Sequence, residues 1–181
     1  MKYLFIFIFI LFSNKVYLQT AKPTFFGAKI GYNNSNISGE TTDGEKSGYL
    51  GNEFYIGLFT ETQLTTKINL QTELIYSFTE DYSFLEVPIT IKYNVYKKLQ
   101  VFLGPKLDFL LDNDDDVFES NYKFKNFGIS ADFGAQYPIS KRFFAEARYS
   151  IGFTEQLTQD IQLDINNAKR NTFRIGVGYR F

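Results

Sequence analysis

The amino-acid sequence predicts an all-β fold: an eight-stranded antiparallel up-and-down transmembrane β-barrel, preceded by a signal peptide. Three observations support this prediction. Eight stretches of about ten residues alternate between apolar and polar positions. The connections between these stretches alternate between short and long. Aromatic residues, 21 Phe and 13 Tyr, make up 19% of the chain, which is more than a soluble domain of this size usually carries.

The first 21 residues are typical of a targeting segment. Lys2 precedes an unbroken apolar run over residues 3–12, and Ser13, Asn14 and Lys15 end it. This run is too short to span a bilayer as a helix, which needs about 20 residues. We therefore expect a secretory signal peptide over residues 1–21, cleaved between residues 18 and 21, and a barrel domain over residues 22–181. A buried N-terminal strand is the alternative interpretation.

The eight alternating stretches have the length that a tilted strand needs to cross a bilayer, about ten residues. They cover residues 26–33, 50–61, 68–78, 85–95, 99–109, 127–137, 143–153 and 173–181. All follow the period of two that is typical of strands, and none follows a helical period.

In the first four stretches, apolar side chains alternate with glycine, amide or charged residues. The clearest is the fourth, in which Leu85, Val87 and Ile89 alternate with Glu86 and Pro88. The apolar positions of the first three are Phe26, Ala28, Ile30, Tyr32, Leu50, Phe54, Ile56, Leu58, Ile68, Leu70, Leu74, Tyr76 and Phe78.

The last four stretches repeat this pattern. In the final one, Phe173, Ile175 and Val177 alternate with Arg174 and Gly176. The apolar positions of the other three are Leu99, Val101, Leu103, Leu107, Phe109, Phe127, Ile129, Ala131, Phe133, Ala135, Tyr137, Phe143, Ala145, Ala147, Tyr149, Ile151 and Phe153.

The connections are expected to form two different rims. Those around residues 61–67, 96–98 and 138–141 are short, whereas those at 34–48, 112–123 and 154–170 are long. The link at 79–83 is short but belongs to the long series by its position. Bacterial barrels have short periplasmic turns and longer outer loops, so both barrel termini are expected in the periplasm.

Alternation also fits a soluble lipocalin-like barrel, whose apolar face points inward. The content of the two faces favours the membrane barrel. The apolar face carries almost no glycine and no charge, as lipid contact requires, because a charge at mid-membrane costs about 2–4 kcal/mol. The polar face mixes glycines with charged residues of both signs, which fits a narrow interior where small residues make room for ion pairs.

Tyrosines near strand ends are expected to form interfacial girdles: Tyr32, Tyr76, Tyr93, Tyr137 and Tyr179.

Charges on the polar face are expected to pair with one another. An eight-stranded barrel is just wide enough for side chains to fill it, and an unpaired buried charge is costly. We expect a structural network of Lys29, Glu53, Glu73, Glu86, Lys92, Lys106, Asp108, Asp132, Glu146, Arg148 and Arg174. A narrow proton or ion path is the functional alternative.

The sequence offers little for catalysis or metal binding. Cysteine and histidine are both absent, which excludes disulfides, thiolate sites and the commonest general base. The acidic run from Asp112 to Asp116, followed by Glu119, resembles the start of a calcium loop, but Val117 stands where glycine is expected. A solvated loop is the preferred interpretation and weak divalent-cation binding the alternative. We expect no enzyme, no cofactor and no metal site.

Several segments resemble a known family. They are FGAKIG at 26–31, QTELIYS at 71–77, LEVPI at 85–89 with Lys92 and Tyr93, LGPKL at 103–107, ARYSIG at 147–152 and GVGYRF at 176–181. The chain is similar to the outer-membrane β-barrel domain family of the PorT or "porin family" type, related in architecture to the OmpX and OmpA barrels. This resemblance implies a Gram-negative outer-membrane location and no catalytic residues. The terminal Phe181 also resembles the signal read by the barrel-assembly machinery.

The expected function is therefore that of an integral outer-membrane barrel with a structural or surface-interaction role. The alternative is transport, either as a narrow channel or as part of a protein secretion system. Expected partners are outer-membrane lipid and lipopolysaccharide, with the assembly machinery during biogenesis. Charge is nearly balanced, 19 basic against 20 acidic residues, so nucleic acid is not expected. The barrel is expected to be a monomer.

Overall fold

The computed structural model describes residues 22–41, 46–79, 82–113, 122–124, 126–155, 157–159 and 165–181. Eight long strands and two short ones account for nearly all of them. They are β1 (Thr24–Thr41), β2 (Lys46–Gln63), β3 (Ile68–Phe78), β4 (Tyr82–Tyr96), β5 (Leu99–Asn113), β6 (Tyr122–Phe124), β7 (Phe127–Pro138), β8 (Phe143–Gly152), β9 (Leu157–Gln159) and β10 (Ile165–Arg180). The predicted signal peptide lies outside the described residues.

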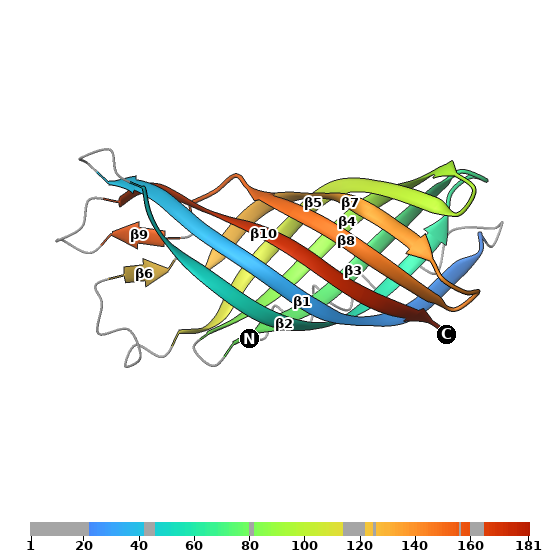
Figure 1. The fold of residues 1–181 in the computed structure, drawn as a ribbon, viewed down its shortest axis with the longest axis horizontal. Coiled ribbons are helices and arrows are strands. Elements are labelled where there is room, and N and C mark those ends of the chain that lie inside the picture. The colour runs from blue at the N-terminus through green and yellow to red at the C-terminus, as the bar shows by residue number, and fades with distance from the viewer. Residues whose placement is uncertain are drawn as a thin grey trace.

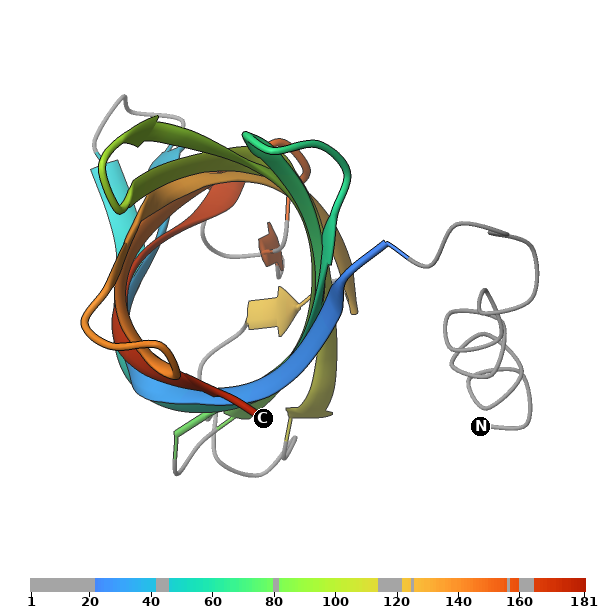
Figure 2. The same ribbon diagram turned by 90° about the vertical axis from the view of Figure 1, so that its right-hand side faces the viewer.

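The long strands form one closed barrel in the order β1-β10-β8-β7-β5-β4-β3-β2 (Figure 2). Each strand pairs antiparallel with its neighbour in the chain, and β1 closes the barrel against β10. This closing register begins at Gly27 opposite Arg180 and runs to Thr41 opposite Ile165. The predicted all-β, eight-stranded up-and-down barrel is confirmed.

The two rims of the barrel differ. At one end lie the short turns at residues 64–67, 97–98 and 139–142, together with the C-terminus (Figure 1). At the other end, β6 and β9 pair as a separate two-stranded sheet. Figures 1 and 2 together place this small sheet at the level of the outer ends of β1, β2 and β10 and across the mouth of the barrel.

The long connections differ from the sequence prediction. Residues 34–48 were expected to form a loop, yet β1 continues to Thr41 and β2 begins at Lys46. The other two expected loops contain β6, β9 and the first residues of β10. The apolar alternation marks only the part of a strand that faces lipid. Backbone pairing continues beyond this part, where polar residues alternate between the two faces of the strand.

The outer face of the barrel carries a continuous apolar band. Large apolar side chains point outward and are exposed, for example Phe54 at 62%, Leu103 at 63% and Ile175 at 48%. The predicted girdle tyrosines all lie on this face, with Tyr32 and Tyr76 toward the long-strand rim and Tyr93, Tyr137 and Tyr179 toward the short turns. Among the described residues, no helix has the length and apolar character of a membrane span.

Candidate functional site in the barrel interior

All eleven residues of the expected charge network point into the barrel, and none is more than 5% exposed. They alternate along each strand with the outward-facing apolar residues, so the period of two places them. The structure joins them into ion pairs that connect strands far apart in the chain, such as Lys29 with Glu146 at 3.0 Å.

The middle of the interior is centred on Arg148 of β8. Its guanidinium contacts Glu73 at 2.6 Å, Asp132 at 2.7 Å and Glu146 at 3.0 Å. Lys29 of β1 also contacts Glu73, as well as Glu146. Both basic groups therefore have at least two acidic partners, whereas Asp132 pairs with Arg148 and accepts a hydrogen bond from Ser150 at 2.6 Å.

Nearer the long-strand rim, Arg174 and Arg170 of β10 share the acidic groups of β2, β4 and β5. Arg174 contacts Glu86 at 2.7 Å and donates from Nε to Asn33 at 2.7 Å. Arg170 contacts Glu53 at 2.7 Å and Asp108 at 3.4 Å. The ammonium of Lys106 lies between Glu86, at 2.9 Å, and Asp108, at 3.0 Å.

At the short-turn end, the network becomes a mixture of amides and charges. Lys92 donates to Gln136 at 2.5 Å and lies 3.4 Å from Glu61. Glu61 also accepts from Asn69 at 2.7 Å and pairs with Arg180 at 3.2 Å. The Arg180 side chain is 16% exposed, so this layer forms the edge of the interior.

Three charged residues of this network were missed by the sequence prediction: Arg170, Arg180 and Glu61. Arg170 was assigned to a loop because the apolar alternation begins only at Phe173, and Arg180 and Glu61 stand at strand ends. With them the described part of the interior is balanced, since seven basic groups face seven acidic ones there. These are Lys29, Lys92, Lys106, Arg148, Arg170, Arg174 and Arg180 against Glu53, Glu61, Glu73, Glu86, Asp108, Asp132 and Glu146.

Interior aromatic rings lie beneath the cations. The guanidinium of Arg148 sits 4.8 Å from the ring centre of Phe102, and that of Arg174 sits 4.6 Å from Tyr55. Arg170 lies 4.1 Å from the Phe84 ring. Such stacking is favourable when the cation is desolvated. The alternation of apolar and polar residues does not predict this stacking, because these rings occupy positions on the polar face.

The expectation that interior glycines make room for ion pairs is wrong at several positions: they make room for these rings. A Cβ on Gly176 would lie 1.9 Å from the Tyr55 hydroxyl, and one on Gly178 would lie 2.1 Å from the Phe144 ring. A Cβ on Gly134 would lie 2.6 Å from Phe102. Each ring therefore lies between a side-chain-free stretch of wall and a cation.

The interior is sealed to water along the described part of the barrel. Glu86, Lys92, Asp132 and Arg174 are completely buried, so they have no contact with water from either mouth. The described residues also contain no group of three or more acidic side chains that could hold a metal ion. Of the acidic run, residues 114–121 lie outside the described residues, so the cation alternative stays untested.

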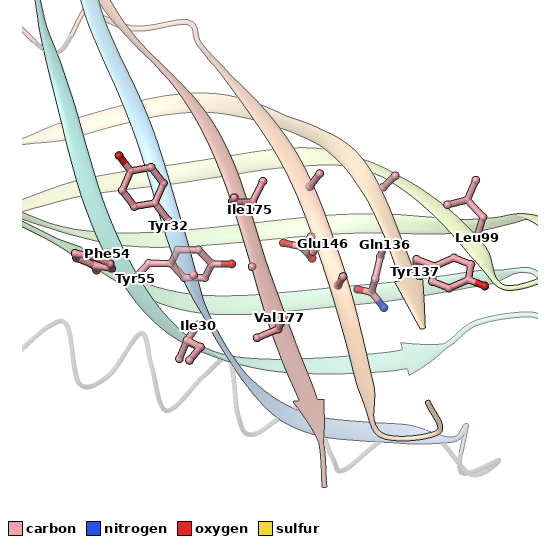
Figure 3. Close-up of a pocket in the computed structure, with 15 residues that line it drawn as sticks. Ile30, Tyr32, Phe54, Tyr55, Leu99, Gln136, Tyr137, Glu146, Ile175 and Val177 are labelled. Atoms are coloured by element: carbon pink, nitrogen blue, oxygen red, sulfur yellow. The ribbon is translucent and has the colours of Figure 1, made fainter. Parts of the chain in front are cut away.

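Among the described residues, hollows open in the barrel wall and at its short-turn mouth. One, of about 850 Å³, opens in the wall where Gly31 pairs with Gly176, and outward residues such as Ile30 and Val177 line it (Figure 3). It belongs to the apolar band that meets lipid. The other, of about 310 Å³, forms the short-turn mouth beside Glu61 and Arg180.

The sequence profile of the outer membrane protein beta-barrel domain matches residues 7–181. The chain belongs to this family. Its location is therefore the outer membrane, as predicted. No curated protein matches the sequence of this outer-membrane barrel.

Solved structures share the fold of this outer-membrane barrel. Neisserial surface protein A is 12% identical, with 86% of this chain and 97% of that chain covered and a TM-score of 0.52. Ail of Yersinia pestis in a phospholipid nanodisc is 14% identical, with 88% and 100% covered and a TM-score of 0.51. OprG of Pseudomonas aeruginosa is 14% identical, with 88% and 97% covered and a TM-score of 0.50. At these identities the likeness concerns the fold alone.

Proposed function

We propose that this protein is a closed, non-catalytic outer-membrane barrel that holds a three-stranded sheet outside the membrane as an interaction surface. The sheet consists of the outer ends of β2, β1 and β10. In this proposal the short turns and both barrel termini face the periplasm. The interior charge network serves stability rather than transport.

The observation that carries the proposal is the extension of β1 and its neighbours past the apolar band. The outward residues of β1 change from Tyr32 to Asn34 and Asn36, while the strand continues to Thr41. Residues 34–41 span about 26 Å along the strand. This length of paired strand has no role in crossing the bilayer.

One edge of this projecting sheet is open. β2 pairs with β3 only as far as Phe54 opposite Phe78, so residues 46–52 have no strand on that side within the described chain. An open edge presents unpaired backbone donors and acceptors, which an extended peptide can complete as an additional strand. We therefore propose extended segments of other proteins as partners.

Conductance separates this proposal from the transport alternative. The pure full chain, inserted into planar bilayers, is expected to show no steady single-channel steps, because the described interior excludes water. Reproducible steps of constant size would support the narrow channel instead.

The orientation of the barrel in the membrane can be measured with single introduced cysteines, because the native chain contains no cysteine. The variants Asn36→Cys and Ser140→Cys place one thiol at each rim. A membrane-impermeant maleimide applied to intact cells is expected to label Asn36→Cys only. Labelling of Ser140→Cys alone would reverse the proposed orientation.

The open edge is tested by selecting a random 12-residue peptide library on the full chain in nanodiscs. The matched control is a variant whose β1–β2 hairpin is shortened by joining residue 36 to residue 50, which face each other in the native register. Peptides enriched on the native chain are expected to lose binding when alternate backbone amides are N-methylated. Equal enrichment on both chains would overturn the proposed surface.

A further inference from the structure

Four asparagines form an outward-facing patch where β2, β1 and β10 leave the apolar band. This asparagine patch consists of Asn34, Asn36, Asn52 and Asn171. The first three are exposed and Asn171 is half-buried. They alternate with buried residues such as Asn33 and Ser35, so their side chains lie on the outward face. The Asn171 Oδ1 accepts from the Gly152 N–H at 3.1 Å, so only its amide NH2 group faces a ligand.

The patch is compact because its members are cross-strand neighbours. Asn34 lies opposite Asn52 and donates to its Oδ1 at 3.0 Å. Asn36 lies opposite Asn171 in the β1–β10 register. The side chains of Asn34 and Asn36 are about 7 Å apart along the strand. The Asn36 amide makes no hydrogen bond within the described chain, which leaves its donors and acceptor free for a ligand.

Aromatic rings lie directly below the patch. Tyr32 is opposite Phe54, with their rings edge to face at 5.9 Å between centroids. Phe173 lies opposite Asn34 on the other neighbouring strand. These three rings end the lipid-facing band on this side of the barrel, so whatever contacts the patch lies at the level of the lipid headgroups.

The chemistry of the patch is neutral. Its amides donate and accept hydrogen bonds without charge, which suits the hydroxyl groups of a sugar. Phosphate recognition relies instead on Arg or Lys. The nearest cation along β10 on this face is Lys169, which lies opposite Glu155 in an isolated bridge and so adds no clear excess of positive charge.

We propose that the asparagine patch binds the sugar headgroup of an outer-leaflet glycolipid in the same membrane. The amides hydrogen-bond sugar hydroxyls, and the rings of Tyr32, Phe54 and Phe173 contact the apolar part of the same lipid. This inference rests on the proposed orientation, in which the patch faces outward from the cell.

The test compares two glycolipids that differ in their sugars. The full chain is placed in nanodiscs of phospholipid with either lipid A or rough lipopolysaccharide that retains its core sugars, and co-purifying glycolipid is measured by native mass spectrometry. The native chain is expected to retain the core-bearing lipid about tenfold more than lipid A, because several asparagine amides each add a hydrogen bond to the core sugars. The preference is expected to persist in high salt, because it does not depend on charge.

Matched variants assign the preference to the patch. Asn34→Val/Asn36→Val/Asn52→Val is expected to abolish it, whereas Thr24→Val/Thr62→Val, which removes an exposed cross-strand contact at the opposite rim, is expected to keep it. Heat-modifiable gel mobility verifies that each variant is folded. If the triple variant does not fold, Asn36→Val alone must weaken the preference.

Three results would overturn the inference. They are equal retention of the two lipids by the native chain, an unchanged preference in the asparagine variants, and free core oligosaccharide binding as tightly as the glycolipid. Cysteine labelling separates this failure from failure of the proposed function. If Asn36→Cys is labelled from outside but no sugar preference is found, only the glycolipid inference fails.

Discussion

At the residue scale, the interior depends on charges that are held by several partners at once. Arg174 has no exposed surface and contacts Glu86, Asn33 and the Tyr55 ring together. Arg180 makes a comparable pair with Glu61, but at the partly exposed mouth. Burial should therefore decide how much each arginine contributes to the free energy of unfolding. When an arginine is removed, water can replace it as the partner of the carboxylate only at the mouth.

The first prediction compares these two arginines. Arg174→Met is expected to lower the free energy of unfolding by about 3–5 kcal/mol, because Glu86 loses a partner in a site without water. Arg180→Gln is expected to lower it by less than about 1 kcal/mol. Urea titration in lipid vesicles, followed by gel mobility without boiling, measures both. An equal loss of unfolding free energy in the two variants would contradict the prediction that burial determines how much each arginine stabilises the barrel.

A second prediction concerns the glycines that face aromatic rings. Gly178→Ala is expected to destabilise the barrel by about 1–3 kcal/mol, because the new Cβ overlaps the Phe144 ring, which already packs on Phe59. Gly57→Ala is the control, since its Cβ would approach no atom closer than 3.1 Å; its neighbours would be Ile75 Cγ1 at 3.1 Å, the Leu74 carbonyl oxygen at 3.2 Å and Lys29 Cγ at 3.5 Å. Its effect is expected to stay within about 1 kcal/mol. The same urea titration applies, and a neutral Gly178→Ala would refute the close ring contact.

At the scale of the strand, each long element has a lipid-facing part and a part above the membrane. On β5, Leu103 is 63% exposed and lies in the middle of the outward apolar positions from Leu99 to Leu111. On β1, Asn34 is also exposed but lies beyond Tyr32, where the band ends. The two positions have the same geometry in the sheet and differ only in the solvent that surrounds them.

Lysine substitution should distinguish the lipid around Leu103 from the water around Asn34. Leu103→Lys is expected to cost about 2–4 kcal/mol, because the charge enters the hydrocarbon region. Asn34→Lys is expected to cost less than about 1 kcal/mol. Refolding yield and urea midpoints in bilayers report the difference. A soluble barrel would tolerate both substitutions equally.

At the scale of the whole molecule, closure depends on the last strand. β10 pairs with both β1 and β8, and the Phe181 amide donates to the Phe26 carbonyl at 2.9 Å. The Phe181 ring is 73% exposed, at the short-turn end of the outward stripe of β10. Its backbone therefore contributes to closure, whereas its side chain is available for recognition by another protein.

This separation predicts different results in cells and in the test tube. Phe181→Ser is expected to reduce the amount of folded protein in the outer membrane several-fold, if the ring marks the chain for assembly. The purified variant is expected to refold into detergent with nearly native yield, because no packed core is lost. Unchanged levels in cells would exclude the predicted assembly role.

The sequence by itself determined the architecture and the two faces of every strand. A period of two is a local property, so each alternating stretch can be assigned without knowing its neighbours. It also predicts which charges belong to the polar face, from Lys29 to Arg174, because lipid excludes charge from the other face. Those statements require only the pattern along the chain.

The tertiary structure alone decided which charges meet, how far the strands extend and what the glycines contact. Arg170 lies beyond the apolar alternation, and only the register of β10 against β1 brings it inside, beside Glu53. Gly178 and Phe144 are 34 positions apart, and strand pairing makes them neighbours. Such contacts depend on register and closure, which involve all eight strands at once, and so no local pattern in the sequence specifies them.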